Sequence, residues 1–487
     1  MGGYHFFCNF AAVMLIISVV LAYFALLFVI SHRTGRRATN ESFFRADRRA
    51  PWYMVAFGMV GASISGVTFV SVPGMVERLQ MTYLQTCMGF ILGYVVVAFA
   101  LLPLYYRLNL VSIYGFLGQR LGKRSHKTAS AFFLVSKMTG AAVKFYVVCI
   151  ILQRFVFEPQ GIPFAVTVVI LVLLIWLYTR QGGIKTLVWT DSLQTVCLFT
   201  ALFLIIYKVI GDLGMSVGEA LIAVRHSELS RVFVFDDWVS TQNFWKQFVS
   251  GVFIVIVMTG LDQDMMQKNL TCKTLRSAQK DMCSYGVAFL PANLLFLSLG
   301  VLLTLWYQQR GMALPVRGDE LLPQFVSLTS YFSPVITCVF VLGVVAASFS
   351  SADSALTSLT TIWCVDLAER GSDEQLRRRV HLLMCAVFVL FIMVFHTANS
   401  SSLIDAVYTI VSYTYGPLLG LFAYGLLTRR PVKDRLVPYV AVASPVLCYL
   451  LDTCIGALTG YHFGYELLML NGLLTFAGLY IPSVAFP

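Results

Sequence analysis

The chain has 487 residues, of which 58% are hydrophobic and 12% charged, and its mean hydropathy is +0.78. These values exclude a soluble globular protein and are typical of a chain that crosses a membrane many times. The net charge of +11 follows the membrane topology described below, so it does not indicate nucleic-acid binding. The eleven cysteines have no CxxC spacing, which implies neither a zinc site nor a disulfide framework.

Apolar runs of spanning length predict an all-α, polytopic membrane protein with about thirteen transmembrane helices. The first run has no small-residue cleavage site after it, so we expect a retained helix and not a signal peptide. The longest loop, 211–244, is interpreted as a cover on the outer face and not as a lid. The predicted spans lie near 9–30, 52–75, 81–105, 128–153, 162–179, 187–209, 245–266, 282–307, 331–363, 380–397, 402–427, 436–456 and 465–485.

The basic residues predict the orientation of the chain. Most of the 35 Lys and Arg fall in alternate connecting segments, and the positive-inside rule makes these segments cytoplasmic. They are 33–49, 107–127, 180–185, 268–280, 370–379 and 429–435. The N-terminus is therefore expected outside and the C-terminus in the cytoplasm.

The second predicted span contains GASISG from Gly61 to Gly66, followed by Pro73. Glycines tolerate irregular dihedral angles, and an interrupted membrane helix frees carbonyls that a cation can bind. We expect Gly61 and Ile64 to supply such carbonyls. The alternative is close helix packing through small residues.

Two lysines lie within the fourth predicted span, in a sequence that is otherwise largely apolar. Lys144 sits near its middle, too deep to reach the interface easily, so it needs either a substrate carboxylate or an internal acid as a partner. Lys137 lies two turns nearer the cytoplasm and is expected to extend to the interface.

Acidic residues mark the sixth and seventh spans. Asp191 lies about one turn into the sixth span, and with Asp353 and Ser354 it could hold a cation or a proton. The alternative for Asp191 is an ion pair with Lys185. In the seventh span, VMTGLDQDMMQ (257–267) carries a glycine and two acids, which solvated salt bridges explain as well as an ion path does. If this span begins a second set of five, the chain is an inverted repeat with its site between two broken helices.

The ninth predicted span carries FSSADSALTS, from Phe349 to Ser358. A charge at the bilayer centre costs at least roughly 2.5–3.5 kcal/mol, so the Asp353 carboxylate requires a partner or a cation. On a helix, the hydroxyls of this run fall on one arc, with the carboxylate at its edge. The alternative is that each hydroxyl bonds to a carbonyl of the preceding turn. Together the hydroxyls and the carboxylate predict an ion site.

Five stretches together resemble the sodium:solute symporter family, which includes bacterial galactose, proline and sialic acid carriers. They are GASISGVTFVSVPG (61–74), LVSIYGFLGQRLG (110–122), GGIKTLVWTDSLQ (182–194), AASFSSADSALTS (346–358) and YTYGPLLGL (413–421). The resemblance covers almost the whole chain and implies a LeuT-type fold in a bacterial inner membrane. It implies an extra helix at 1–31, inverted five-helix repeats at 50–210 and 245–430, and two further helices at 431–487.

The resemblance also implies ligands for one or two Na⁺ ions. The principal site comprises the equivalents of Gly61, Ile64, Ala347, Ser350 and Ser351. In the branch of the family with a second sodium, the matching positions here are Asp191, Asp353 and Ser354. Asp353 departs from the family, where a hydroxyl residue is usual, and the carboxylate could strengthen cation binding or carry a proton.

Lys144 resembles the basic residue that meets the substrate carboxylate in the sialic acid carriers, with Lys in place of Arg. This resemblance favours an acidic solute, although a lysine cannot reproduce the bidentate geometry of an arginine. The positions that contact sugar in the galactose carriers do not match. The substrate candidates are Ser63, Ser65, Thr68, Gln85 and Lys144.

These features predict a sodium-coupled symporter that imports a small polar or acidic solute, such as a sialic acid or a sugar, by alternating access. The expected partners are the solute and the lipid bilayer, with no nucleic acid and no obligate protein partner. A proton-coupled symporter of the same fold and a non-transporting membrane receptor are the alternatives. An enzyme is not predicted, because neither an HExxH motif nor a GxSG setting for Ser63 is present.

Overall fold

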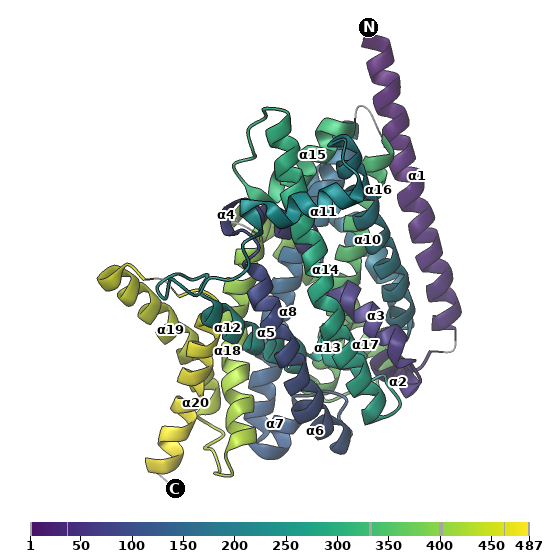
Figure 1. Ribbon diagram of the computed structural model, residues 1–487. Helices are drawn as coiled ribbons and strands as arrows, with labels where there is room; N and C mark the ends of the chain where they lie inside the picture. The colour runs from purple at the N-terminus through teal and green to yellow at the C-terminus, as the bar shows by residue number, and fades with distance from the viewer. Residues whose placement is uncertain (1, 37, 331–333, 399–402, 462, 486–487) are drawn as a thin grey trace.

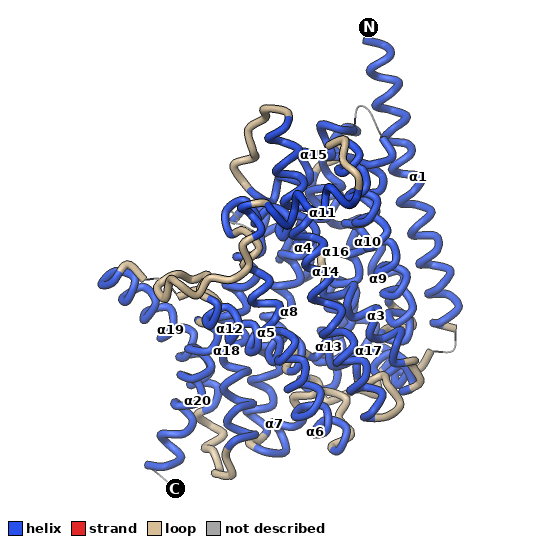
Figure 2. Tube along the Cα trace, viewed as in Figure 1, coloured by secondary structure: helices blue, strands red, loops and turns tan. Residues whose placement is uncertain are grey.

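The computed structural model describes residues 2–36, 38–330, 334–398, 403–461 and 463–485 (Figure 1). Within these ranges the chain is built from helices and loops, and no strand is present (Figure 2). An isolated β-bridge joins Ala50 to Cys272. The predicted all-α fold is confirmed.

The described residues also confirm the predicted spans. Ten helices are long and apolar enough to cross a membrane, two bent helix pairs each form a further span, and one shorter apolar helix completes the thirteen. In chain order the spans are α1 (Gly2–Gly35), α3 with α4 (Trp52–Ser63 and Gly66–Leu79), α5 with α6 (Tyr83–Val96 and Leu102–Arg107), α8 (Lys123–Leu152), the short α9 (Phe164–Thr179), α10 (Ile184–Asp212), α12 with α13 (Phe244–Val255 and Gln263–Asn269), α14 (Leu275–Gln309), α16 (Pro334–Ile362), α17 (Glu374–Ala398), α18 (Leu403–Leu427), α19 (Val437–Thr459) and α20 (Leu467–Ala485).

Each bent pair begins a series of five spans. The first series runs from α3 to α10 and the second from α12 to α18, with α1 before them and α19 and α20 after. The limits of the two repeats stay a prediction, as does the inverted relation between the two series.

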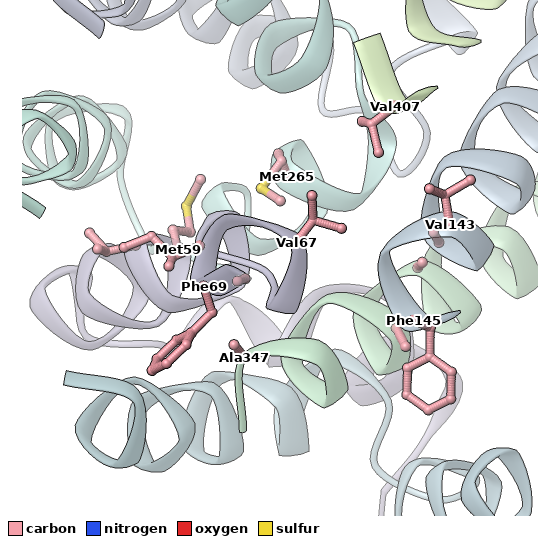
Figure 3. Close-up of a cluster of buried hydrophobic side chains, with 14 of the residues drawn as sticks. Met59, Val67, Phe69, Val143, Phe145, Met265, Ala347 and Val407 are labelled. Carbon is pink, nitrogen blue, oxygen red and sulfur yellow. The ribbon is translucent and has the colours of Figure 1, made fainter. Parts of the chain in front are cut away.

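Helix α16 lies at the centre of the bundle. It packs against α10, α8, α3 and α4, and 83% of its most apolar stretch is buried inside the protein. Figure 3 shows its Ala347 within a hydrophobic cluster that includes Phe69 of α4 and Phe145 of α8. The outer helices α1 and α19 are far more exposed, with 28% and 22% of their apolar stretches buried inside the protein. Both lie at the edges of the molecule (Figure 1). Their exposed apolar faces suit contact with lipid, whereas α16 can keep polar groups away from lipid.

The segment predicted as a long outer loop contains a helix, α11 (Val217–His226). Its start is fixed by a capping box in which Ser216 accepts from the backbone of Glu219 and the Glu219 side chain accepts from the backbone of Ser216. This reciprocal arrangement satisfies two of the free N–H groups at a helix start, which is why the segment is helical there. The predicted loop is therefore partly helical, and its role as a cover stays a prediction.

Candidate ion and solute site

The second span is broken, as the sequence predicts. Helix α3 ends at Ser63 and α4 starts at Gly66, and the two are bent by 58°. The Ser65 amide donates to the Ser63 carbonyl at 3.1 Å, so it does not bond to Gly61 as it would in a continuous helix. The Ile64 carbonyl precedes the first turn of α4 and lies outside its hydrogen-bond ladder. The break therefore leaves the carbonyls of Gly61 and Ile64 without their usual helical partners.

A hydroxyl of α16 meets this break directly. Ser351 Oγ donates to the Ala62 carbonyl at 2.8 Å, and it also lies 3.3 Å from the carbonyl of Ala347, one turn earlier in α16. The five predicted ligands of the principal sodium site thus lie on the broken second span and on α16, and these two elements are in contact at Ser351. Carbonyl and hydroxyl oxygens are hard donors that suit an alkali or alkaline-earth cation.

Gly61 is required for the close approach of α3 to α10. A Cβ at this position would lie 1.9 Å from Thr195 Oγ1 and 3.1 Å from Thr195 Cα. The Thr195 hydroxyl cannot move away freely, because it bonds to the carbonyls of Asp191 at 2.7 Å and Phe57 at 3.2 Å. Both interpretations of the GASISG motif, a broken helix and close packing, therefore apply at this position.

The structure divides the predicted second ion site into two parts. Asp191 accepts from Ser350 Oγ at 2.8 Å, and its other carboxylate oxygen lies 2.8 Å from the Nζ of Lys268. The alternative pairing of Asp191 with Lys185 was wrong, because Lys185 lies 3.0 Å from Asp47 instead. The buried ammonium of Lys268, a residue in the segment 268–280 that the basic residues predict to be cytoplasmic, already neutralises Asp191.

Asp353 has a different environment. Its carboxylate accepts from Tyr178 Oη at 2.6 Å and from Ser354 Oγ at 3.2 Å. Among the described residues, no lysine, arginine or histidine nitrogen lies within 4.0 Å of it. Asp353 and Ser354 thus remain together as predicted, whereas Asp191 has its own partner.

The seventh span is also broken, with a 69° bend between α12, which continues to Gly260, and α13. Asp262 caps α13 by accepting from the backbone of Asp264 at 2.8 Å and of Met265 at 3.3 Å. Lys137 lies 3.1 Å from Asp262 and 2.7 Å from Asp264, and Tyr415 Oη donates to Asp262 at 2.7 Å. Lys137 therefore does not extend to the interface as expected. These acids form buried internal ion pairs and not solvated salt bridges.

A cavity of about 120 Å³ lies between the two breaks. Four of the five substrate candidates line it: Ser63, Ser65, Thr68 and Lys144. Ser351 of the ion site and Asp262 of the second break line the same space, so an ion and a solute can lie close together. The cavity wall also includes the aromatic residues Tyr83, Phe90, Tyr94, Tyr285, Phe289, Tyr408 and Tyr415.

The surroundings of two predicted solute contacts, Ser63 and Lys144, bear on what the cavity can bind. Ser63 Oγ shares a hydrogen bond with Tyr285 Oη, so this pair presents its remaining hydrogen-bonding capacity to the cavity. Lys144, by contrast, has no carboxylate oxygen within 4.0 Å among the described residues. The internal ion pair that was one of its two expected partners is therefore not formed.

Gln85 does not line the cavity and is removed from the candidates. Its amide donates to the Gln242 carbonyl at 2.9 Å and accepts from the Val234 backbone at 3.1 Å. Both partners belong to the outer segment before α12. A buried amide near the outer end of a span suggests a polar contact, but the sequence could not show that a loop more than a hundred residues away supplies it.

The sodium:solute symporter family matches residues 43–433. The chain belongs to this family. The human sodium/iodide cotransporter is 22% identical over 85% of the chain. The sodium/sialic acid symporter of Aliivibrio fischeri is 24% identical over 85% of the chain. The matched region spans 64% of the iodide cotransporter's length and 83% of the sialic acid symporter's length.

The fold is shared with a solved Na⁺-coupled sialic acid symporter, described in a substrate-bound outward-open state. The TM-score is 0.79 at 21% sequence identity, covering 99% of this chain and 98% of that one. Together with the thirteen spans, this likeness confirms the LeuT-type fold.

Proposed function

We propose that this protein is a sodium-coupled symporter that imports a small acidic solute by alternating access. The observation that carries the proposal is the contact between Ser351 of α16 and the broken second span. A sodium ion held by oxygens from both elements would fix their relative position, and the adjoining cavity would then bind solute more tightly. By thermodynamic linkage, the solute would raise the affinity for sodium by the same factor.

Lys144 supports an acidic solute. It lines a cavity shared with hydroxyl groups, and an ammonium within a membrane protein that has no internal acid beside it is stabilised when an anionic ligand enters. The sodium/sialic acid symporters of Aliivibrio fischeri and Proteus mirabilis are named for a solute of this class. A sialic acid or a related carboxylated sugar is therefore the solute class we propose.

A bacterial inner membrane is the proposed location, with the N-terminus outside and the C-terminus in the cytoplasm. The basic segments support the orientation, and the bacterial relatives support the membrane. The N- and C-termini lie at opposite ends of the molecule (Figure 1), which fits an odd number of spans. Family membership favours transport over the receptor alternative.

The test is uptake into proteoliposomes of radiolabelled sialic acids, neutral sugars, amino acids and simple carboxylates, with sodium or potassium outside. We expect sodium to stimulate uptake of an acidic member of the panel. Uptake driven by a pH gradient without sodium would instead identify the proton-coupled alternative.

Lys144→Met tests the solute class. A hydrogen bond to a charged group contributes about 1.5–3 kcal/mol, so we expect the affinity for the acidic solute to fall at least about tenfold. Lys144→Arg keeps the positive charge and is the matched control, which should retain a preference for acidic solutes. Equal loss of acidic and neutral solutes in Lys144→Met would contradict a direct contact with a carboxylate.

A further inference from the structure

We propose that the Lys268 ammonium is a built-in cation that occupies the position at Asp191 where a second sodium would bind, so that the carrier couples a single sodium ion. This inference rests on the proposed function and specifies its ion stoichiometry. It also replaces the expectation of a second sodium at Asp191, Asp353 and Ser354.

The first support is the geometry at Asp191. Its two carboxylate oxygens face different partners, with Lys268 Nζ 2.8 Å from Oδ2 and Ser350 Oγ 2.8 Å from Oδ1. Asp191 is 1% exposed and Lys268 is 2% exposed. A sodium ion at Asp191 would have to displace this ammonium, leaving it buried without a counter-ion, or lie beside it as a second buried cation on one carboxylate, and both arrangements are strongly unfavourable.

The second support is that Lys268 has no competing acid partner. Asp264 precedes it by one turn in α13, but Asp264 is paired with Lys137 at 2.7 Å. Asp353 is satisfied by the hydroxyls of Tyr178 and Ser354. Of the described carboxylates, only Asp191 lies within 4.0 Å of the Lys268 ammonium. The Lys268 ammonium therefore belongs to Asp191.

The third support is the link from this pair to the principal sodium site. A hydroxyl has one proton and two lone pairs. Because the Ser350 proton is donated to Asp191, that hydrogen bond leaves the lone pairs of Ser350, one of the predicted ligands of the first site, unused. The pair formed by Lys268 and Asp191 thus orients a ligand of the first site, and Lys268 holds the charge of Asp191 constant while it does so. Because Lys268 lies in α13, it also ties the second broken span to α10 and α16.

The experiment counts bound sodium without any solute. Radioactive sodium is titrated onto the purified full-length protein, and the ions bound per chain are measured at saturation. We expect one ion per chain for the wild type and two for Lys268→Met, with the second lost again in the double variant Lys268→Met, Asp191→Asn. Lys185→Met is the matched control, since it removes a lysine from a partly exposed pair with Asp47, and it should bind one ion.

Two ions per chain in the wild type would overturn the inference, as would one ion per chain in folded Lys268→Met. If Lys268→Met does not fold, Lys268→Gln replaces it, because its amide can still donate to Asp191 while the charge is removed, and the same gain of one ion is expected. Neither overturning result touches the proposed function. Absence of any sodium binding in the wild type would overturn the proposed function itself.

Discussion

The two bent spans have similar geometry but different partners. The first, between α3 and α4, bends by 58°, and the second, between α12 and α13, by 69°. At the first break the groups in contact are neutral carbonyls and hydroxyls, represented by Ala62 and Ser351. At the second break they are charged side chains, represented by Asp262 and Lys137.

This difference separates ligand binding from support. Backbone groups released by a bend must be satisfied within the protein, because lipid offers no hydrogen bonds. At the second break the Asp262 side chain caps α13 and its charge is balanced by Lys137, so the protein completes the site alone. At the first break no charged side chain contributes to the predicted ligand set, so a bound sodium ion would supply the positive charge there. A bent membrane helix is therefore informative about ion binding only when its partners are known.

The largest effect is expected for Ser351→Ala. This change removes the hydroxyl that joins α16 to the first break, so sodium stimulation of uptake should be abolished while the fold is retained. Sodium-dependent uptake in proteoliposomes measures it. Ser358→Ala is the control on the same helix, because among the described residues the Ser358 hydroxyl bonds only within its own helix, to the carbonyl of Ala355. Normal sodium stimulation in Ser351→Ala would remove the first break from the ion site.

A large loss of stability is expected for Lys137→Met. The change leaves Asp262 and Asp264 buried without their shared cation, and breaking a buried ion pair in this way costs about 3–5 kcal/mol. The melting temperature of the purified protein should fall, while sodium should still raise it, because the first break is intact. Lys127 lies on the same helix as Lys137 and forms an exposed pair with Glu369. Lys127→Met should therefore change stability by less than about 1 kcal/mol. A melting temperature equal to that of the control would show that the second break does not depend on its charges.

A smaller difference is expected between alanine substitutions at the two breaks. In Gly61→Ala the new methyl group meets the β-branched Thr195, including its backbone, and overpacking of this kind costs about 1–3 kcal/mol. In Gly260→Ala the nearest atoms are methyl groups at the ends of two side chains, Leu101 at 2.5 Å and Val97 at 2.8 Å, and the three nearest atoms include none of the backbone. Gly61→Ala should therefore lower the melting temperature more than Gly260→Ala does. The reverse order would contradict the close packing at the first break.

Much of the fold follows from local properties of the sequence. The spans are set by runs of apolar residues, and the first break is set by GASISG. The hydroxyl run in α16 could also be placed on one face from helical periodicity alone. Ser351 therefore lies opposite the break, as the sequence indicates.

Contacts between distant spans could not be predicted in the same way. Lys268 follows two acids and precedes further basic residues, so its local sequence is indistinguishable from that of a cytoplasmic lysine. Its burial depends on the bend of α13, which carries it toward α10 and Asp191. Lys137 was misplaced for the same reason, since its two acids lie more than a hundred residues further along the chain.

The hydrogen bond from Ser351 to Ala62 has a consequence for the return half of the transport cycle. A carrier that has released its ion must change conformation empty, and exposed carbonyls in a dry interior would make that step slow. Here the Ser351 hydroxyl satisfies the Ala62 carbonyl, which lies between the predicted ligands Gly61 and Ile64. The cost of exposing that carbonyl is thus removed from the return step, which should speed resetting.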